Sequence, residues 1–260
     1  MLSLKYSLYD CFAEAAFQGH TAAIVEFPDK PDLKIAAKIA QELCQTVTCF
    51  VWKKYDEFWV ETLAKDGNNW PINHGLLGVA RHLLGPMDEG ILHTENGSFQ
   101  VKTIGNTITI FLPKLSLDLT EMPDRLNQAF DTTPVSVRET GKTCVVELRT
   151  IDEVINLETD FNRIAKLDYD RIVLTAEDQT LPFDFVCRYF SPKHNIDENN
   201  GSLYIQTFLP LFWQERLHKD DFSFLQLSSR RAMGKARIAG DMICVEAPVF
   251  HAFEGVLKIS

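Results

Sequence analysis

The sequence lacks the signatures of several large protein classes. None of its six cysteines forms a Cys-x-x-Cys pair, and its seven histidines show neither His-x-x-x-His nor His-Glu-x-x-His spacing, so we expect no metal site. No apolar run reaches the roughly 18 residues of a membrane-spanning helix, and the first residues lack a signal-peptide pattern. We therefore expect a cytoplasmic protein whose thiols are reduced and buried.

Basic side chains are few relative to acidic ones. The chain carries 26 Lys and Arg against 36 Asp and Glu, a net charge of −10. A nucleic-acid surface needs clustered Lys and Arg, and the one dense basic cluster, 229–237, is short enough to be a solvated turn. We expect neither a nucleic-acid nor a membrane partner. The 260 residues contain no Pro/Gly/Ser-rich linker, so they form one large domain or two small ones.

A short phrase occurs twice, about half a chain apart. It reads Asn-His-Gly at 73–75 and Asn-Gly-Ser at 200–202. Each copy follows a strand-like run and precedes an almost wholly apolar run, 76–84 in the first case and 203–213 in the second. A helix that is apolar all round must be buried on all sides. The repeat therefore predicts two similar domains, each wrapped around its own central helix.

The two predicted helix starts are candidate ligand sites. The N-terminus of a helix presents free N–H groups and a positive dipole end, which suit a carboxylate. We expect N–H groups near Gly75 and Ser202 to contact such a ligand, and Asn73 and Asn200 are good N-cap residues. The first domain should cover residues 1–117, joined by a returning strand at about 249–260, and the second should cover 118–248.

Six stretches, taken in order along nearly the whole chain, resemble the motifs of one family. They are 10–12 with 17–25, 42–51, 72–75, 185–192, 196–202 and 226–232. The first is similar to a pattern of Asp-x-Phe followed by Phe-x-Gly-Asn-Pro-Ala, and the fourth to Phe-Val-Ser-Arg-Phe-Phe-Ala-Pro. Together they resemble the PhzF-like, phenazine-biosynthesis-type isomerases.

The resemblance implies an α+β fold of the diaminopimelate-epimerase type. Such a protein has two pseudo-symmetric domains, each a rolled, mostly antiparallel β-sheet around a central buried helix. The resemblance further implies a cofactor-independent active site in the cleft between the domains, a small carboxylate metabolite as ligand, and a homodimer. The fold agrees with the one that the repeated phrase predicts independently.

The resemblance also identifies positions where this chain departs from the family. The family's proton-shuttling Glu falls on Val47, which can neither accept nor donate a proton. The family's Asp of Glu-Asp-Pro falls on Asn199, and the Asn of Gly-Asn-Pro falls on His20. Related epimerases with two catalytic thiols need a Cys at each helix start, and neither Ile72 nor the Asn199–Asn200 pair supplies one.

His74 and His20 remain the candidate catalytic residues, since the pKa of histidine suits proton transfer. Alternatively, His74 is a structural helix cap and His20 a satisfied surface histidine. Glu42 could be a displaced base, although a solvated helix carboxylate is the simpler interpretation. The candidate substrate-binding residues are Gly19, Asn73, Gly75, Asn199, Asn200, Gly201 and Ser202.

Three functions are consistent with these residues. The first is a PhzF-like isomerase or epimerase that uses His74, with or without His20, in place of the missing Glu. The second is a catalytically inactive family member that binds a small molecule. The third is a structural partner in a larger assembly. A polar site with both histidines within proton-relay reach would favour the enzyme, whereas a site filled by Trp70 or Tyr204 would favour the binding module.

Overall fold

The computed structural model describes residues 2–121, 123, 126–130 and 132–259, and the chain divides into two compact units. Unit 1 comprises Met1–Leu112 with Cys244–Ser260, and unit 2 comprises Pro113–Ile243. The predicted division lay after residue 117, with a return at about 249. The return begins earlier because Pro248 does not interrupt the last strand, β15, which runs unbroken over Met242–Ile259.

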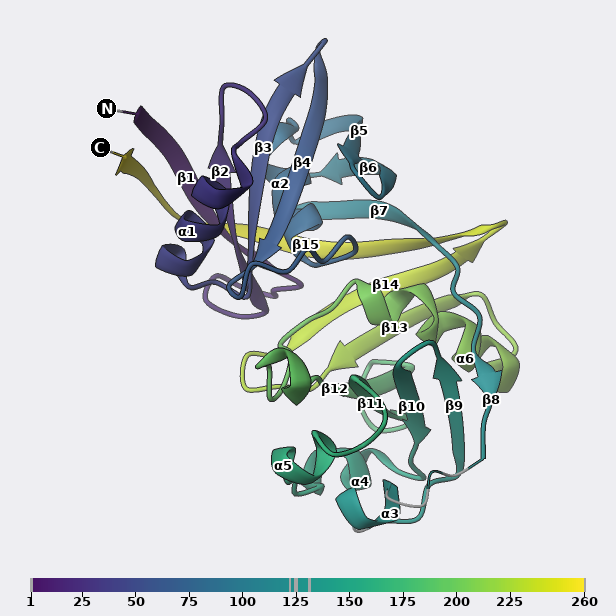
Figure 1. Ribbon diagram of the computed structural model, residues 1–260. Helices are drawn as coiled ribbons and strands as arrows, with labels where there is room; N and C mark the ends of the chain where they lie inside the picture. The colour runs from purple at the N-terminus through teal and green to yellow at the C-terminus, as the bar shows by residue number, and fades with distance from the viewer. Residues whose placement is uncertain (1, 122, 124–125, 131, 260) are drawn as a thin grey trace. The chain divides into compact units, whose positions relative to one another are not determined.

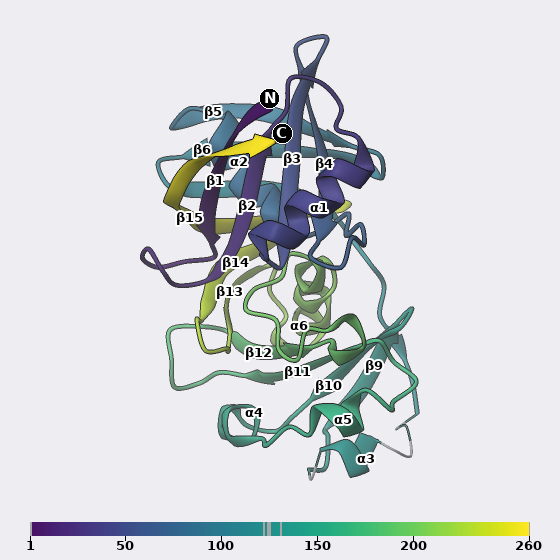
Figure 2. The ribbon, with the colours of Figure 1, turned by 60° about the vertical axis from the view of Figure 1, so that its left-hand side comes forward.

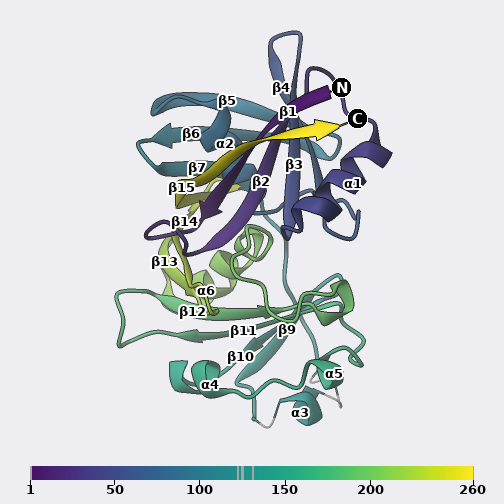
Figure 3. The same ribbon diagram turned by 90° about the vertical axis from the view of Figure 1, so that its left-hand side faces the viewer.

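Unit 1 is a sheet that closes on itself. Its strands follow the order β1-β2-β3-β4-β5-β6-β7-β15, and β15 also pairs antiparallel with β1, with Leu2 opposite Ile259. The two paired strands are the dark purple and yellow ribbons of Figure 3. The remaining elements are β1 (Leu2–Cys11), β2 (His20–Glu26), α1 (Leu33–Leu43), β3 (Val47–Lys54), β4 (Glu57–Ala64), α2 (Gly75–Leu83), β5 (Met87–Thr94), β6 (Gly97–Ile104) and β7 (Thr107–Pro113).

Helix α2 is the central helix of unit 1. It contacts β1, β2, β3, β5 and β6, and all of its residues from Gly75 to Ala80 are buried, so the strands surround it (Figure 1). Helix α1 packs on the outside of β3 and β4, where Ala36 and Ile39 join a core with Phe50. Its N-cap is Asp32, whose Oδ1 accepts hydrogen bonds from the N–H groups of Lys34 and Ile35.

Unit 2 is an open sheet in the order β8-β9-β10-β11-β12-β13-β14. One face packs against α6, where Trp213 Nε1 donates a hydrogen bond to Thr175 Oγ1 at 3.1 Å. Helices α3, α4 and α5 (Figure 2) contribute to one hydrophobic core with strands β10, β11 and β12. Its elements are β8 (Asp118–Leu119), α3 (Leu126–Ala129), β9 (Ser136–Thr140), β10 (Thr143–Glu147), α4 (Ile151–Asn156), α5 (Phe161–Ile164), β11 (Arg171–Glu177), β12 (Phe185–Phe190), η1 (Pro192–His194), η2 (Tyr204–Thr207), α6 (Leu209–Leu217), β13 (Asp221–Gln226) and β14 (Ala232–Ala239).

The second apolar helix differs from the single element expected over 203–213. It is split into the 3₁₀ turn η2 and the α-helix α6, because Phe208 leaves the helical region with a φ of −138°. Pro210 then occupies the first turn of α6, where its missing N–H costs nothing. Leu209, Phe212 and Trp213 are buried, but the last turn of α6 reaches solvent, so burial on all sides holds only for its first part.

The two units repeat one another element by element. In unit 1, helices α1 and α2 each join two parallel neighbours, β2 with β3 and β4 with β5. In unit 2, α4 with α5 joins parallel β10 and β11, and η2 with α6 joins parallel β12 and β13. The paired strands between them are antiparallel. The expected α+β architecture of two similar units is therefore confirmed. Among the described residues, no helix is long and apolar enough to cross a membrane.

Candidate functional site

The loop before each central helix is closed by the same asparagine turn. In the α2 loop (residues 65–74), Asn73 Oδ1 accepts a hydrogen bond from the N–H of Gly75 at 2.8 Å. In the η2 loop (residues 195–203), Asn199 Oδ1 accepts from the N–H of Gly201 at 3.0 Å. Asn73 is therefore structurally equivalent to Asn199. The repeated phrase pairs Asn73 with Asn200 instead, so it is shifted by one residue.

The N–H groups expected to hold a carboxylate already have partners. Gly75 and Gly201 donate to the two asparagine side chains, and the N–H of Ser202 donates to Gln226 Oε1 at 3.0 Å. Gln226 is 1% exposed, and its Nε2 donates to the carbonyl of Asn199 at 2.6 Å. A ligand would have to displace these side chains, so the expectation of free helix N-termini is wrong for this conformation.

His20 and His74 form a buried pair beside the α2 loop. Each is 3% exposed, and the rings are stacked with centroids 3.6 Å apart and planes 12° from parallel. The interpretation of His20 as a surface residue is therefore wrong. Stacked rings cannot exchange a proton directly, because an N–H···N bond lies in the ring plane.

The environment of His74 fixes its protonation. Its Nε2 lies 3.1 Å from the carbonyl of Thr21, and since a carbonyl only accepts, Nε2 must be the donor. Burial holds the pKa of His74 well below its usual range, the nearby His20 lowers it further, and the bond to Thr21 partly opposes both. His74 is thus a neutral imidazole with its lone pair on Nδ1. His74 occupies the N-cap position of α2, but its side chain makes no capping bond and is held by Thr21 instead.

Val47 faces the start of α2 from the first position of β3. It is fully buried, and its Cγ1 would lie 3.0 Å from a Cβ built on Gly75. Cys49 also lines this position, and burial raises the pKa of its thiol, so it is an inert thiol. Glu42 lies on an exposed position of α1 and is a solvated carboxylate. Of the six cysteines, only Cys44 departs from the expected burial.

Gly19 shapes the approach to His20. Its φ is +64°, and a Cβ there would collide with the carbonyl of Cys11, so only glycine fits. Asp10 holds the same turn, because Oδ2 accepts from the N–H of Phe17 at 2.7 Å and Oδ1 from Thr21 Oγ1 at 2.6 Å. The resemblance-derived positions in this part of unit 1 thus come together around the two histidines.

Arg171 is a candidate functional residue of unit 2 that the sequence did not reveal. It begins β11, and its guanidinium carbon lies 5.3 Å from the ring centroid of Tyr204. It also hydrogen-bonds Tyr189, whose pKa burial raises to about 12 while Arg171 opposes the rise. Tyr204 OH pairs with Thr143 Oγ1 at 3.0 Å. No carboxylate of the described residues lies within ion-pair distance of Arg171.

No family model matches the sequence. A Pseudomonas aeruginosa protein named an uncharacterized isomerase is 24% identical over 257 residues, covering 96% of this chain and 97% of the relative. A PhzF-family phenazine biosynthesis protein of Enterococcus faecalis superposes with a TM-score of 0.92 at 19% identity, over 99% of this chain and 100% of that one. A predicted epimerase of Pseudomonas aeruginosa superposes with a TM-score of 0.74 at 17% identity, over 98% and 99%.

These similarities extend over the whole chain. They confirm the resemblance to PhzF-like proteins, and they show that the chain has the fold of PhzF-family and epimerase structures. Because the identities are only 17% to 24%, these similarities show the fold and do not show the roles of individual residues. Among the described residues, no group of three His, Cys, Asp or Glu side chains is arranged to hold a metal ion.

Proposed function

We propose that the chain is a cofactor-independent protein of the PhzF-like isomerase and epimerase type that binds a small carboxylate metabolite and has lost the family's proton shuttle. The proposal combines the whole-chain similarity to proteins named as isomerases with two observations on the residues. One observation concerns what can hold a carboxylate, and the other concerns what can move a proton.

The cation Arg171, which has no ion-pair partner among the described residues, supports carboxylate binding. A guanidinium can hold a carboxylate through two parallel hydrogen bonds, and it does so best where it is partly removed from water. Arg171 is half-buried and stacked against Tyr204, which limits the freedom that binding would otherwise remove. The η2 loop is tied to the same strand, because the N–H of Asn199 donates to the carbonyl of Tyr189, whose side chain hydrogen-bonds Arg171. This loop contains Asn199, Asn200, Gly201 and Ser202.

The surroundings of Val47 support the loss of turnover. The side chain at position 47 faces the start of α2, where a carboxylate would be favoured by the helix dipole, yet valine carries no proton. His74 is the residue most suited to any residual proton transfer, with its lone pair on Nδ1. Its lowered pKa makes it a weak base, so it replaces a carboxylate poorly. The inactive binding module is therefore favoured over the enzyme.

Calorimetric titration with a panel of small 2-amino, 2-hydroxy and dicarboxylic acids tests the binding. We expect at least one to bind, and Arg171→Ala to weaken it by about 10- to 100-fold, the range for losing a charged hydrogen-bond partner. Arg171→Lys should recover only part of the affinity. Arg149→Ala changes the same charge at an exposed position of unit 2 and should leave the affinity unchanged. Equal losses in both Ala variants, or no binding at all, would reject the proposal.

We further propose that the protein is a cytoplasmic homodimer. Light scattering of the purified chain tests its assembly, with twice the mass of one chain expected and a single-chain mass as the contrary result.

A further inference from the structure

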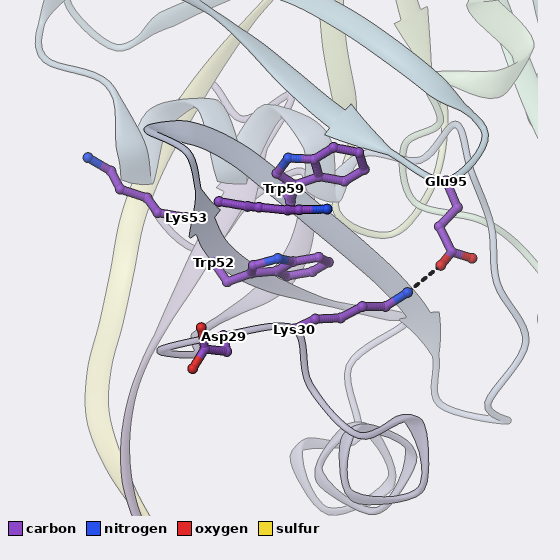
Figure 4. Close-up of a pocket in the computed structure, with 7 residues that line it drawn as sticks. Asp29, Lys30, Trp52, Lys53, Trp59 and Glu95 are labelled. Carbon is purple, nitrogen blue, oxygen red and sulfur yellow. Dashed lines mark hydrogen bonds and ion pairs between the residues drawn. The ribbon is translucent and has the colours of Figure 1, made fainter.

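A separate pocket of about 410 Å³ opens on unit 1. Figure 4 shows its walls, with Trp52 and Trp59 one above the other and Lys30 alongside Trp52. The lining residues come from β3, β4, the turn after β2 and the β5–β6 turn. None belongs to the α2 loop or surrounds Val47, so this pocket is distinct from the site described above.

Aromatic rings form one wall of the pocket. Trp52 and Trp59 are directly opposite each other on β3 and β4, with ring centroids 6.4 Å apart and planes 26° from parallel. His93 of β5 continues the row, 5.3 Å from Trp59 and 28° from parallel with it. Trp52 is only 7% exposed, so it is held by the core, while Trp59 is half-buried. A planar ring is the group that such a surface binds best.

The charge of the pocket is opposite to that of the chain. Lys30, Lys53 and Lys54 line it with Asp29 and Glu95, which leaves one positive charge in excess, whereas the whole chain carries −10. Lys30 is ion-paired with Glu95 across one end (Figure 4).

Lys54 is the cation most available to a ligand. Its Nζ lies 5.4 Å from the centroid of the Trp59 ring, and no carboxylate of the described residues is within ion-pair distance of it. By contrast, Lys53 places its Nζ 4.9 Å from the ring of Phe58 and points away from the tryptophans in Figure 4. A carboxylate attached to a ring that lies against Trp59 would therefore meet the ammonium of Lys54.

We propose that this pocket binds a planar aromatic carboxylate, with the ring against Trp59 and the carboxylate at Lys54. The two interactions reinforce each other, because a ligand ring against Trp59 would cover part of the exposed ammonium of Lys54 and so strengthen its attraction for the carboxylate. The proposal is independent of the proposed function, since it involves neither Arg171 nor the α2 loop.

Titration calorimetry with 2-naphthoate on the full chain tests it, and 2-naphthylmethanol is the neutral counterpart. We expect 2-naphthoate to bind with a Kd below about 1 mM and the alcohol to bind about tenfold more weakly. Trp59→Ala and Lys54→Glu should each weaken 2-naphthoate by about tenfold or more. Glu95→Gln removes a nearby negative charge and should strengthen it by about twofold to fivefold.

Two control variants show whether 2-naphthoate binds in this pocket. Lys102→Glu makes the same charge change on a lysine outside the pocket and should alter the affinity by less than about twofold. Arg171→Ala should have no effect, which distinguishes this pocket from the proposed function. The proposal is overturned if 2-naphthoate shows no saturable binding at 5 mM (about five times the expected limit), if the alcohol binds equally well, or if Lys54→Glu and Lys102→Glu weaken binding equally. Because Lys54 is exposed, its variant keeps the test valid even if Trp59→Ala fails to fold.

Discussion

The α2 loop of unit 1 and the η2 loop of unit 2 share one backbone turn but have different surroundings. In both, an asparagine side chain accepts the N–H of the glycine two residues later. Around the α2 loop stand two stacked imidazoles and a valine, all buried. Around the η2 loop stand Arg171, Tyr204 and the buried Gln226.

The turn that the two loops share belongs to the fold, whereas the residues around it differ between the units. The turn recurs because each sheet must start a buried helix after a strand, and the buried N–H groups there need acceptors. Four of the residues that differ come from the first positions of strands: His20 of β2 and Val47 of β3 in unit 1, and Thr143 of β10 and Arg171 of β11 in unit 2. The strand starts therefore differ between the two units together with His74 and Tyr204 at the helix starts.

The largest loss of stability should follow from removing the side-chain amide of Gln226, which only the η2 loop has. Gln226→Leu would leave the Ser202 N–H and the Asn199 carbonyl buried without their partner, at a cost of about 2–4 kcal/mol in the free energy of unfolding. Gln100→Leu replaces an exposed glutamine of β6 and should cost less than about 0.5 kcal/mol. Urea denaturation of both variants measures the difference, and similar costs would show that the buried amide does not hold the loop.

A smaller effect should show that the two asparagine turns are equivalent. Asn73→Ala and Asn199→Ala each remove a buried acceptor and should each cost about 1–2 kcal/mol. Asn199→Asp keeps the Oδ1 acceptor and should cost less than Asn199→Ala, whereas Asn73→Asp also loses the bond that Nδ2 donates to the carbonyl of Trp70 and should cost at least as much as Asn73→Ala. Denaturant unfolding of the four proteins provides the values. If only one of the two alanine variants were destabilised, the equivalence of the loops would be lost.

An effect of similar size concerns pH and belongs to the α2 loop alone. Because the folded-state pKa of His74 lies below its unfolded value of about 6.5, the unfolded chain binds the proton more readily, and stability is lost as the pH falls below about 6.5. His74→Gln removes this titration. Between pH 7 and pH 5 its free energy of unfolding should therefore fall by about 1–2 kcal/mol less than that of the unaltered protein. Identical pH dependence in the two proteins would show that His74 is not held neutral by burial.

Much of the fold was predictable because it follows from local pattern. The apolar spacing of Ile35 and Ile39 predicts α1, and the apolar run after Gly75 predicts the buried helix of unit 1. The break at Phe208 was not foreseen, since Pro210 lies within an otherwise continuous apolar run. The register of the repeat was missed because matching letters favoured Asn200, whereas the hydrogen bonds equate Asn73 with Asn199.

The site was less predictable because its residues meet only through tertiary structure. The burial of His20 depends on its stacking against His74, which lies far along the chain beyond β3 and β4. Arg171 gave no signal at all: a basic residue before an apolar strand is ordinary, and its contacts with Tyr189 and Tyr204 arise from the pairing of β11 with β12 and from the position of η2. Val47 could be singled out only because the resemblance marks its position.

The proposed function requires that the chain bind a carboxylate but lack a group to move the proton. Solvent-deuterium exchange at the carbon next to the carboxylate, followed by NMR on a carboxylic acid that binds, tests it most directly. We expect no appreciable exchange by the unaltered protein and a rise of about 10²–10⁴-fold in Val47→Glu, with Val47→Gln remaining inactive. Rapid exchange by the unaltered protein, unchanged in His74→Ala, would contradict both the loss of turnover and the role given to His74.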